Sequence, residues 1–259
     1  MLLRLFGLLL LANVTMAQSN YGLSNAHSHN DYEQKRPFWE AFERGFGSIE
    51  ADIYLVKGEL YVAHNQSDIK PERTLENLYI KPLVEKIKQA KANQYPMNGH
   101  FQWLIDLKTG GETLRTLEAK LKPYRQYFDQ NQNKKAIRIV ISGEMPKPND
   151  FDQFDTIFTF DGRKNISYSP AESKRIVILS ENFWTFGPWQ SDGTIKPETF
   201  IKVSQFVDSV HQAGKQIRFW ATPNKVSAYE TLKKLKVDYI GTDSLRLLHE
   251  YLSQQGTKN

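Results

Sequence analysis

Residues 48–64, SIEADIYLVKGELYVAH, read as two short strands joined by a tight turn. Alternate residues of a strand face opposite sides, so Glu50, Asp52 and Tyr54 share one face. Lys57-Gly58 has hairpin-turn composition, and the return strand brings His64 back toward the carboxylates. Two carboxylates beside an imidazole predict an oxygen-rich divalent metal site with an acid or base in reach. The alternative is a half-exposed strand whose charges face water.

The rest of the chain alternates strand-like and helix-like segments. Strands are expected near 21–26, 48–55, 60–63, 101–108, 136–141, 156–160, 175–179, 215–221 and 237–243. Helical patterns are expected at 37–44, 75–93, 112–127, 199–213, 227–235 and 244–254. About eight strands, most of them followed by a helix, predict a parallel sheet closed into a (β/α)₈ TIM barrel.

The first 17 residues are predicted to be a secretory signal peptide. Arg4 supplies a short positive start, 5–14 is largely apolar, and Thr15-Met16-Ala17 resembles a cleavage site. Its removal leaves residues 18–259, a length suited to one barrel domain. Because the chain has no cysteine, disulfides and thiolate ligands are excluded. Export of such a protein indicates a periplasmic or secreted location.

Charge and hydropathy limit the classes of partner. The chain has 34 Lys plus Arg against 29 Asp plus Glu, a formal net charge of +5, with the basic residues scattered. This pattern does not favour nucleic acid, although it suits an anionic small molecule or lipid headgroup. The N-terminal apolar run is too short for stable membrane insertion. The sequence does not indicate an oligomeric state.

Polar residues stand at or near the ends of the expected strands. In closed parallel barrels, catalytic residues collect at the carboxyl ends of the strands. We therefore expect one mouth to gather His27, His29, Glu50, Asp52, Asp106, Lys108, Glu144, Asp161, Glu181, Trp220 and Asp243. Helix capping or simple surface exposure is the alternative for Glu144, Asp161, Glu181 and Asp243.

In their order, these motifs resemble the glycerophosphodiester phosphodiesterase family. The order is a histidine, Ile49-Glu50-Ala51-Asp52, the hairpin to His64, Ile105-Asp106-Leu107-Lys108, Phe219-Trp220-Ala221 and 238-DYIGTD-243. More broadly, the chain resembles phosphatidylinositol-phospholipase-C-like phosphodiesterases, and the opening 27-HSHNDY-32 resembles one branch of that superfamily. The resemblance spans residues 25–245 and implies a TIM barrel with phosphodiesterase activity.

The resemblance also implies roles for individual residues. Glu50, Asp52 and Asp106 match the metal-binding acids, with Asp106 standing where the family commonly has glutamate. His64 matches one catalytic histidine and Lys108 the lysine near the phosphate. Trp220 matches an aromatic residue that lines the pocket. Three carboxylates suit Mg²⁺ or Ca²⁺ better than zinc, which prefers more nitrogen ligands.

The opening motif departs from the family pattern. The family usually has His-Arg-Gly, whereas this chain has His27-Ser28-His29-Asn30, with no arginine to bind the phosphate. His27 and His29 are both candidates for the second catalytic histidine. We favour His29, because Asn30 then takes the arginine's place as a substrate-binding residue. One imidazole would deprotonate the attacking hydroxyl while the other protonates the leaving alkoxide.

Two other functions fit part of the pattern. His27-Ser28-His29 with a late Asp243 also resembles amidohydrolases and polymerase-and-histidinol-phosphatase-type phosphoesterases, which need further histidines. The remaining histidines, His100, His211 and His249, do not follow expected strands. A second alternative is a non-catalytic barrel that binds an anionic ligand or glycan through the aromatic loop 182–189.

Overall fold

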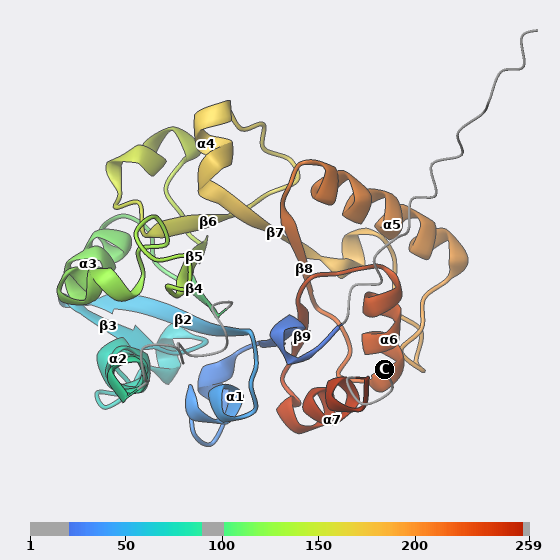
Figure 1. Ribbon diagram of the computed structural model, residues 1–259, viewed down its shortest axis with the longest axis horizontal. Helices are drawn as coiled ribbons and strands as arrows, with labels where there is room; N and C mark the ends of the chain where they lie inside the picture. Colours follow the sequence, from blue (N-terminus) through green and yellow to red (C-terminus); the bar gives the residue numbers. More distant parts are fainter. Residues whose placement is uncertain (1–20, 90–100, 256–259) are drawn as a thin grey trace, which may run out of the picture.

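The chain folds into a nearly closed barrel of eight parallel strands with helices outside it (Figure 1). The computed structural model describes residues 21–89 and 101–255. The barrel strands are β1 (Ala26–Ser28), β2 (Ser48–Val56), β4 (Gln102–Leu107), β5 (Arg138–Gly143), β6 (Phe158–Gly162), β7 (Ile176–Asn182), β8 (Gln216–Trp220) and β9 (Ile240–Thr242). Their order is β8-β7-β6-β5-β4-β2-β1-β9. A bridge between Arg218 and Tyr239 joins the two end strands, so the predicted TIM barrel is confirmed.

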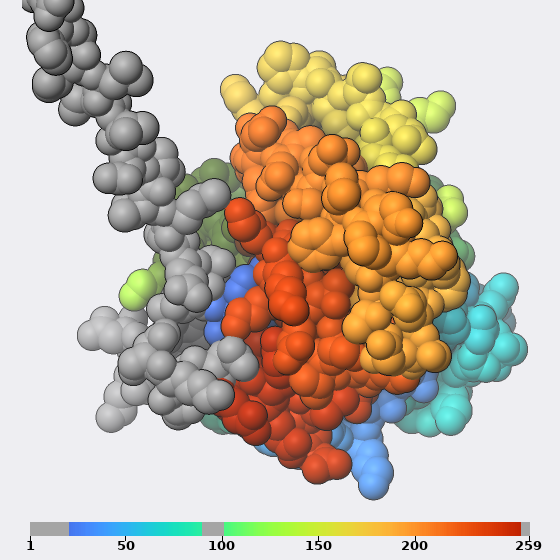
Figure 2. Space-filling view, turned by 90° about the vertical axis from the view of Figure 1, so that its right-hand side faces the viewer, coloured from blue at the N-terminus to red at the C-terminus, as the bar shows by residue number. Residues whose placement is uncertain are grey.

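Helices follow most of the strands and pack on the outside. They are α1 (Trp39–Glu43), α2 (Lys81–Gln89), α3 (Glu112–Leu121), α4 (Pro170–Arg175), α5 (Pro197–Gln212), α6 (Val226–Lys234) and α7 (Leu245–Gln255). Figure 2 shows α5 in orange and α6 and α7 in red covering one flank. The helix expected at 112–127 ends at Leu121, because Pro123 cannot donate a backbone hydrogen bond and a 3₁₀ segment, η6 (Lys122–Tyr127), follows.

The predicted hairpin is confirmed. β2 pairs antiparallel with β3 (Glu59–Val62), with Val56 opposite Glu59. Both turn residues have positive φ, 49° for Lys57 and 81° for Gly58. This conformation matches the twist of a two-residue hairpin, and glycine adopts it without steric cost. The return strand therefore places His64 beyond the carboxyl-terminal half of β2.

The first strand begins later than predicted. Residues 21–26 were expected to be extended, but a 3₁₀ turn, η1 (Leu23–Asn25), occupies most of them. The Asn25 side chain accepts a hydrogen bond from Gly22 N and so stabilises this turn. As a result, His27 lies within β1, whereas His29 lies one residue beyond its end. The two histidines therefore occupy different environments.

Apolar side chains pack on both faces of the barrel wall. On β2, Ile49, Ala51 and Ile53 are fully buried in the main core. A small separate cluster lies on the other face: Leu104, Val140, Ile178 and Tyr239. Two residues further along three of these strands stand Asp106, Ser142 and Ser180, which line a cavity. The apolar cluster thus supports a polar layer at the carboxyl ends of the strands.

Candidate active site

A cavity of about 370 Å³ opens at the carboxyl ends of the barrel strands. Its lining includes eight of the nine predicted site residues: His29, Asn30, Glu50, Asp52, His64, Asp106, Lys108 and Trp220. Asp161 and Glu181 line it as well, as expected, whereas Glu144 does not. Asp243 borders an adjoining space of about 100 Å³ that shares His29, Arg218 and Trp220 with the main cavity.

The ninth predicted residue, His27, lies behind this cavity and is fully buried. Its Nδ1 lies 2.7 Å from Ser48 Oγ, and its Nε2 lies 2.9 Å from Glu50 Oε2 and 2.7 Å from Arg218 Nη1. Burial, reinforced by the Arg218 charge, lowers the pKa of His27 to about 4. His27 is therefore neutral at pH 7 and fixes the orientation of Glu50.

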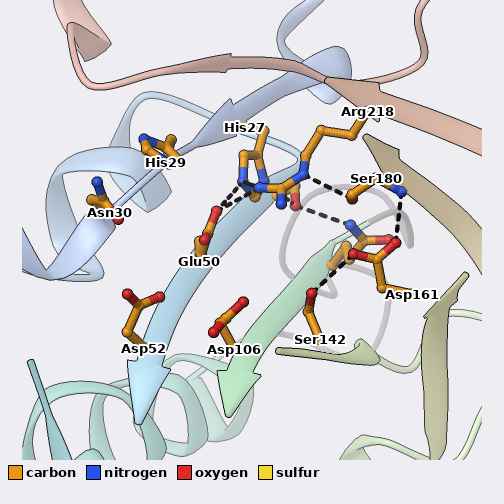
Figure 3. A network of polar contacts seen from close by, with 12 residues as sticks. His27, His29, Asn30, Glu50, Asp52, Asp106, Ser142, Asp161, Ser180 and Arg218 are labelled. Carbon is orange, nitrogen blue, oxygen red and sulfur yellow. Dashed lines mark hydrogen bonds and ion pairs between the residues drawn. The ribbon is translucent and has the colours of Figure 1, made fainter. Parts of the chain in front are cut away.

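Arg218 is a site residue that the sequence analysis missed. It lies on β8, and its guanidinium donates to Glu50 Oε2 at 2.5 Å and to Ser180 Oγ at 3.1 Å (Figure 3). Burial raises the pKa of Glu50, but the Arg218 charge together with His27 and His29 outweighs burial and holds that pKa well below its usual range. An isolated Arg-x-Trp in a strand carries no signal by itself, because its carboxylate partner is 168 residues away.

Lys108 bridges the other two carboxylates. Its Nζ lies 2.8 Å from Asp52 Oδ2 and 3.1 Å from Asp106 Oδ1. Burial and the nearby Glu50 charge raise the pKa of Asp52 to about 6, although Lys108 opposes this rise. Burial also raises the pKa of Asp106. One ammonium therefore faces two carboxylates that sit at matched positions on β2 and β4.

The carboxylate oxygens of this cavity suit a hard cation, although the described residues form no preformed cage of ligands. Glu50 Oε1, Asp52 Oδ1 and Asp106 Oδ2 make no hydrogen bond within the described ranges, and Asp52 Oδ1 is buried without a partner. A buried carboxylate oxygen without a donor is costly, and a cation would satisfy it. Across residues 21–89 and 101–255, however, no three acidic or imidazole side chains are already grouped to hold an ion.

His29 is accessible and is held by an acid. Its Nδ1 lies 2.7 Å from Asp243 Oδ1, and 32% of its side chain is exposed. Burial lowers the pKa of His29, but the hydrogen bond to Asp243 and the nearby carboxylate charges of Glu50 and Asp243 together outweigh burial, so the pKa is raised above its ordinary value. The Nδ1 contact leaves Nε2 available on the other side of the ring. His29 thus has the environment of a proton-transfer group, in contrast to His27.

His64 is anchored through a buried tyrosine. Its Nδ1 lies 3.1 Å from Tyr32 Oη, and the same hydroxyl lies 2.7 Å from Asp52 Oδ2 and 2.8 Å from Asn30 Oδ1. Because the hydroxyl has one proton, the carboxylate is its favoured acceptor and His64 Nδ1–H can donate to it. The His64 side chain is 54% exposed, so its other nitrogen is open to solvent.

A buried carboxylate fixes the loop that carries His29 and Asn30. Asp31 accepts hydrogen bonds from Ser28 Oγ at 2.7 Å, Phe38 N at 2.6 Å and Tyr79 Oη at 2.9 Å. Burial raises the pKa of Asp31 to about 6, although all three hydrogen bonds oppose the rise. The left-handed φ of 46° at Asn30 lies within this braced loop. The histidine and the amide are therefore held in place.

Asp161 forms a second buried ionic group beside the cavity. Its carboxylate accepts from Ser142 Oγ at 2.9 Å and from Ser180 N at 2.7 Å, and it pairs with Arg163 at 3.1 Å. Glu181 pairs with Lys164 at 3.1 Å. Both acids thus already have cationic partners. Trp220 is 44% exposed at the rim, as expected for a residue that contacts a ligand.

The histidines that the amidohydrolase alternative requires do not converge here. His211 Nε2 lies 2.8 Å from Asp238 Oδ2, and Asp238 precedes β9 at the other end of the barrel. His249 lies on the outer helix α7, and His100 is outside the described residues. The described part of the chain therefore offers this alternative no histidine cluster.

Comparison with known proteins gives a consistent family and fold. Residues 18–152 match the family model of the AIM6-like phosphodiesterase domain. Altered inheritance of mitochondria protein 6 homolog from Arthroderma benhamiae is 25% identical, covering 87% of this chain and 82% of that protein. Altered inheritance of mitochondria protein 6 from Saccharomyces cerevisiae is 24% identical, covering 85% and 67%.

Two solved structures share the fold. A glycerophosphodiester phosphodiesterase from Parabacteroides distasonis superposes with a TM-score of 0.57 at 16% identity, over 92% of this chain and all of that one. A phosphodiesterase from Oleispira antarctica, in complex with the product sn-glycerol-3-phosphate, gives 0.50 at 13% identity over 88% and 95%. The likeness to phosphodiesterase barrels that the sequence predicts is confirmed.

Proposed function

Because the chain belongs to the AIM6-like phosphodiesterase domain family, we propose that it cleaves a phosphodiester with the help of a divalent cation. The substrate class is a glycerophosphodiester or a phospholipid headgroup. The supporting observation is a cavity whose lining includes the three carboxylates Glu50, Asp52 and Asp106 together with Lys108, Arg218 and two accessible imidazoles. This combination provides cation ligands, phosphate-binding charges and proton-transfer groups in one place.

The balance of charge in the cavity supports this substrate. Glu50 is paired with Arg218, Asp161 with Arg163 and Glu181 with Lys164, whereas Asp52 and Asp106 share Lys108, so these groups together retain one net negative charge. A divalent cation changes this to a net positive charge of one. That charge is complementary to a phosphodiester, which carries a single negative charge. Without the cation, the same cavity would repel the substrate.

The cation is proposed to be Mg²⁺ or Ca²⁺. Glu50, Asp52 and Asp106 would hold it, using the oxygens that the ion pairs leave without partners. When bound, it supplies a Lewis acid that offsets the charge growing on the phosphoryl oxygens. Arg218 and His27 hold Glu50 in position, and Lys108 holds Asp52 and Asp106.

Proton transfer is assigned to His29 and His64. Asp243 orients His29 and raises its pKa, so this ring is suited to the protonated state that donates to a leaving alkoxide. Tyr32 orients His64, which is suited to accept the proton of the attacking hydroxyl. His27 is too buried for proton exchange with substrate, so we assign it to positioning Glu50. Water and a neighbouring substrate hydroxyl are both compatible nucleophiles.

The proposed location is periplasmic or secreted. It rests on the signal-like pattern of residues 1–17, which lie outside the described residues. Within the described ranges, no helix is long and apolar enough to span a membrane. A fractionation experiment that compares the chain with and without residues 1–17 tests the location. Equal retention in the cytoplasm would contradict it.

Catalysis is tested by His64→Ala. Glycerophosphodiesters, lysophospholipids and phosphoinositides are offered to the purified protein with Mg²⁺, Ca²⁺ or a chelator. We expect ion-dependent turnover that falls about 10²- to 10⁴-fold in the variant, the range for loss of a general acid or base. The half-exposed ring contributes little to packing, so the melting temperature should change little.

His249→Ala on α7 is the matched control and should keep full activity. Full activity in His64→Ala would contradict the assignment. Saturable binding of a phosphodiester without turnover under any ion would instead favour a non-catalytic binding barrel.

A further inference from the structure

Arg218 lies at the boundary between the two spaces at the barrel mouth. It lines both the main cavity and the smaller one beside it, although only 5% of its side chain is exposed. Nε donates to Ser180 Oγ, and Nη1 contacts Glu50 Oε2 and His27 Nε2. These contacts at two edges of the planar guanidinium fix its orientation (Figure 3).

The remaining nitrogen of Arg218 is available to a ligand. Within the described ranges, Nη2 makes no hydrogen bond, and it is not among the enclosed atoms without a partner. Nη2 therefore keeps some accessible surface and has no acceptor among the described residues, at a side chain that lines both spaces. A guanidinium only donates hydrogen bonds, so the group that completes this shell must be an acceptor. Phosphate oxygens match this geometry well.

The other two cations of the lining are also ion-paired, and their side chains are more exposed and so less firmly fixed than that of Arg218. Lys108 is shared between Asp52 and Asp106, and Arg163 is held by Asp161. At the position where the opening motif would carry an arginine, Asn30 offers only a neutral amide. Arg218 is already oriented by Glu50 and so loses little side-chain freedom on binding an anion.

We propose that Arg218 binds a non-bridging oxygen of the substrate's phosphodiester through Nη2. This inference rests on the proposed function. Arg218, which lies far along the chain from the opening motif, would supply the phosphate-binding arginine that the motif lacks. One side chain would then have two functions: Nη1 and Nε hold the buried network, and Nη2 contacts the ligand. An Arg218 with only a structural role would hold the network without contacting the ligand.

Arg218→Lys separates the two roles. Lysine keeps the positive charge beside Glu50 but cannot direct a second nitrogen at the phosphate. Binding of inorganic phosphate is measured by calorimetry with Mg²⁺ and with Ca²⁺, so that no turnover is needed. We expect the dissociation constant to rise about tenfold or more, as for loss of a charge-assisted hydrogen bond. Steady-state kinetics should show a higher KM as well.

Arg138→Lys is the matched control. Arg138 begins β5 at the opposite end of the same barrel, where its Nη1 contacts Gln216 Oε1. This variant should bind phosphate as the wild type does. If Arg218→Lys does not fold, the side-chain ¹⁵N–¹H resonances of Arg218 in the wild type provide the same test, and they should shift on addition of phosphate.

Unchanged phosphate affinity in a folded Arg218→Lys protein would overturn the proposal, as would unshifted Arg218 resonances. Absence of phosphate binding to the wild type under both ions would overturn it too. Failure of the proposed function gives a different pattern: phosphate binds through Arg218, but no phosphodiester is turned over.

Discussion

The two ends of the barrel interior contrast in how they satisfy buried polar groups. At the mouth, Glu50 and Arg218 are both buried and compensate each other through a charged hydrogen bond. At the opposite end, Gln102 and Arg138 line a cavity of about 210 Å³, and Gln102 Oε1 and Arg138 Nε are buried without partners. The mouth is thus organised by paired charges, whereas the other end combines the Arg138 cation with amide side chains and has incomplete hydrogen bonding.

A chain of hydrogen bonds joins the two ends. Gln102 Nε2 donates to Ser48 Oγ at 3.2 Å, Ser48 contacts His27, and His27 contacts Glu50. His27 is therefore the link between the amide end and the charged end. The charge of Arg218 is matched by a buried carboxylate where ligand chemistry needs it, whereas the Arg138 cation at the other end contacts the amide of Gln216.

The largest expected effect is that of Glu50→Gln. Removing this charge leaves the buried Arg218 cation without its carboxylate, and breaking a buried pair typically costs about 3–5 kcal/mol of unfolding free energy. Activity should be lost as well. Denaturant unfolding measures the first effect and phosphodiester turnover the second.

Gln102→Met at the other end is the control for that contrast. It removes one neutral hydrogen bond and should cost about 1 kcal/mol or less. Equal losses of unfolding free energy in Glu50→Gln and Gln102→Met would contradict the proposed difference between the two ends of the barrel.

Addition of a divalent ion should have the next largest effect. If Glu50, Asp52 and Asp106 hold the ion, Mg²⁺ or Ca²⁺ at about 100 times its dissociation constant should stabilise the wild type by about 2.7 kcal/mol. Asp106→Asn should reduce this gain, because it removes a ligand charge. Thermal unfolding of both proteins with and without the ion measures this gain in stability.

Glu144→Gln is the matched control for the ion effect, because Glu144 is exposed and does not line the cavity. It should retain the full gain in stability. An equal gain in wild type and Asp106→Asn would contradict the proposed ligand set.

The smallest expected effect is a shift in pH dependence. The hydrogen bond to Asp243 raises the pKa of His29, so Asp243→Asn should lower it. The limb of the activity profile that belongs to His29 should then move to lower pH. The pair stabilises the fold while His29 is protonated, and this contribution is lost as pH rises through the folded pKa of His29.

The stability difference between wild type and Asp243→Asn should therefore diminish toward alkaline pH. It should also diminish in acid, where Asp243 becomes protonated. Profiles for activity and unfolding that coincide in the two proteins would show that the contact does not tune His29.

Much of the site could be predicted from sequence because its signals are local. The Glu50-Ala51-Asp52 alternation and the Lys57-Gly58 turn fix which side chains share a face within one hairpin. Strand ends gather at one edge of any parallel barrel, so Asp106 and Lys108 could be placed there too. These predictions need no knowledge of distant contacts.

What could not be predicted depends on contacts across the barrel. Arg218 gains its role only when β8 meets the side chains of β1 and β2. Similarly, the choice between His27 and His29 depends on where β1 begins, and the Gly22–Asn25 turn shifts that start. Single-strand patterns do not contain this information.

Cation-dependent cleavage of a phosphodiester can be followed directly by ³¹P NMR of a glycerophosphodiester with the wild-type protein in Mg²⁺ or Ca²⁺. We expect the diester resonance to disappear, a phosphomonoester or cyclic phosphate resonance to replace it, and a chelator to prevent the change. A diester resonance that persists at stoichiometric protein with both ions, and with lysophospholipid and phosphoinositide in its place, would contradict the account.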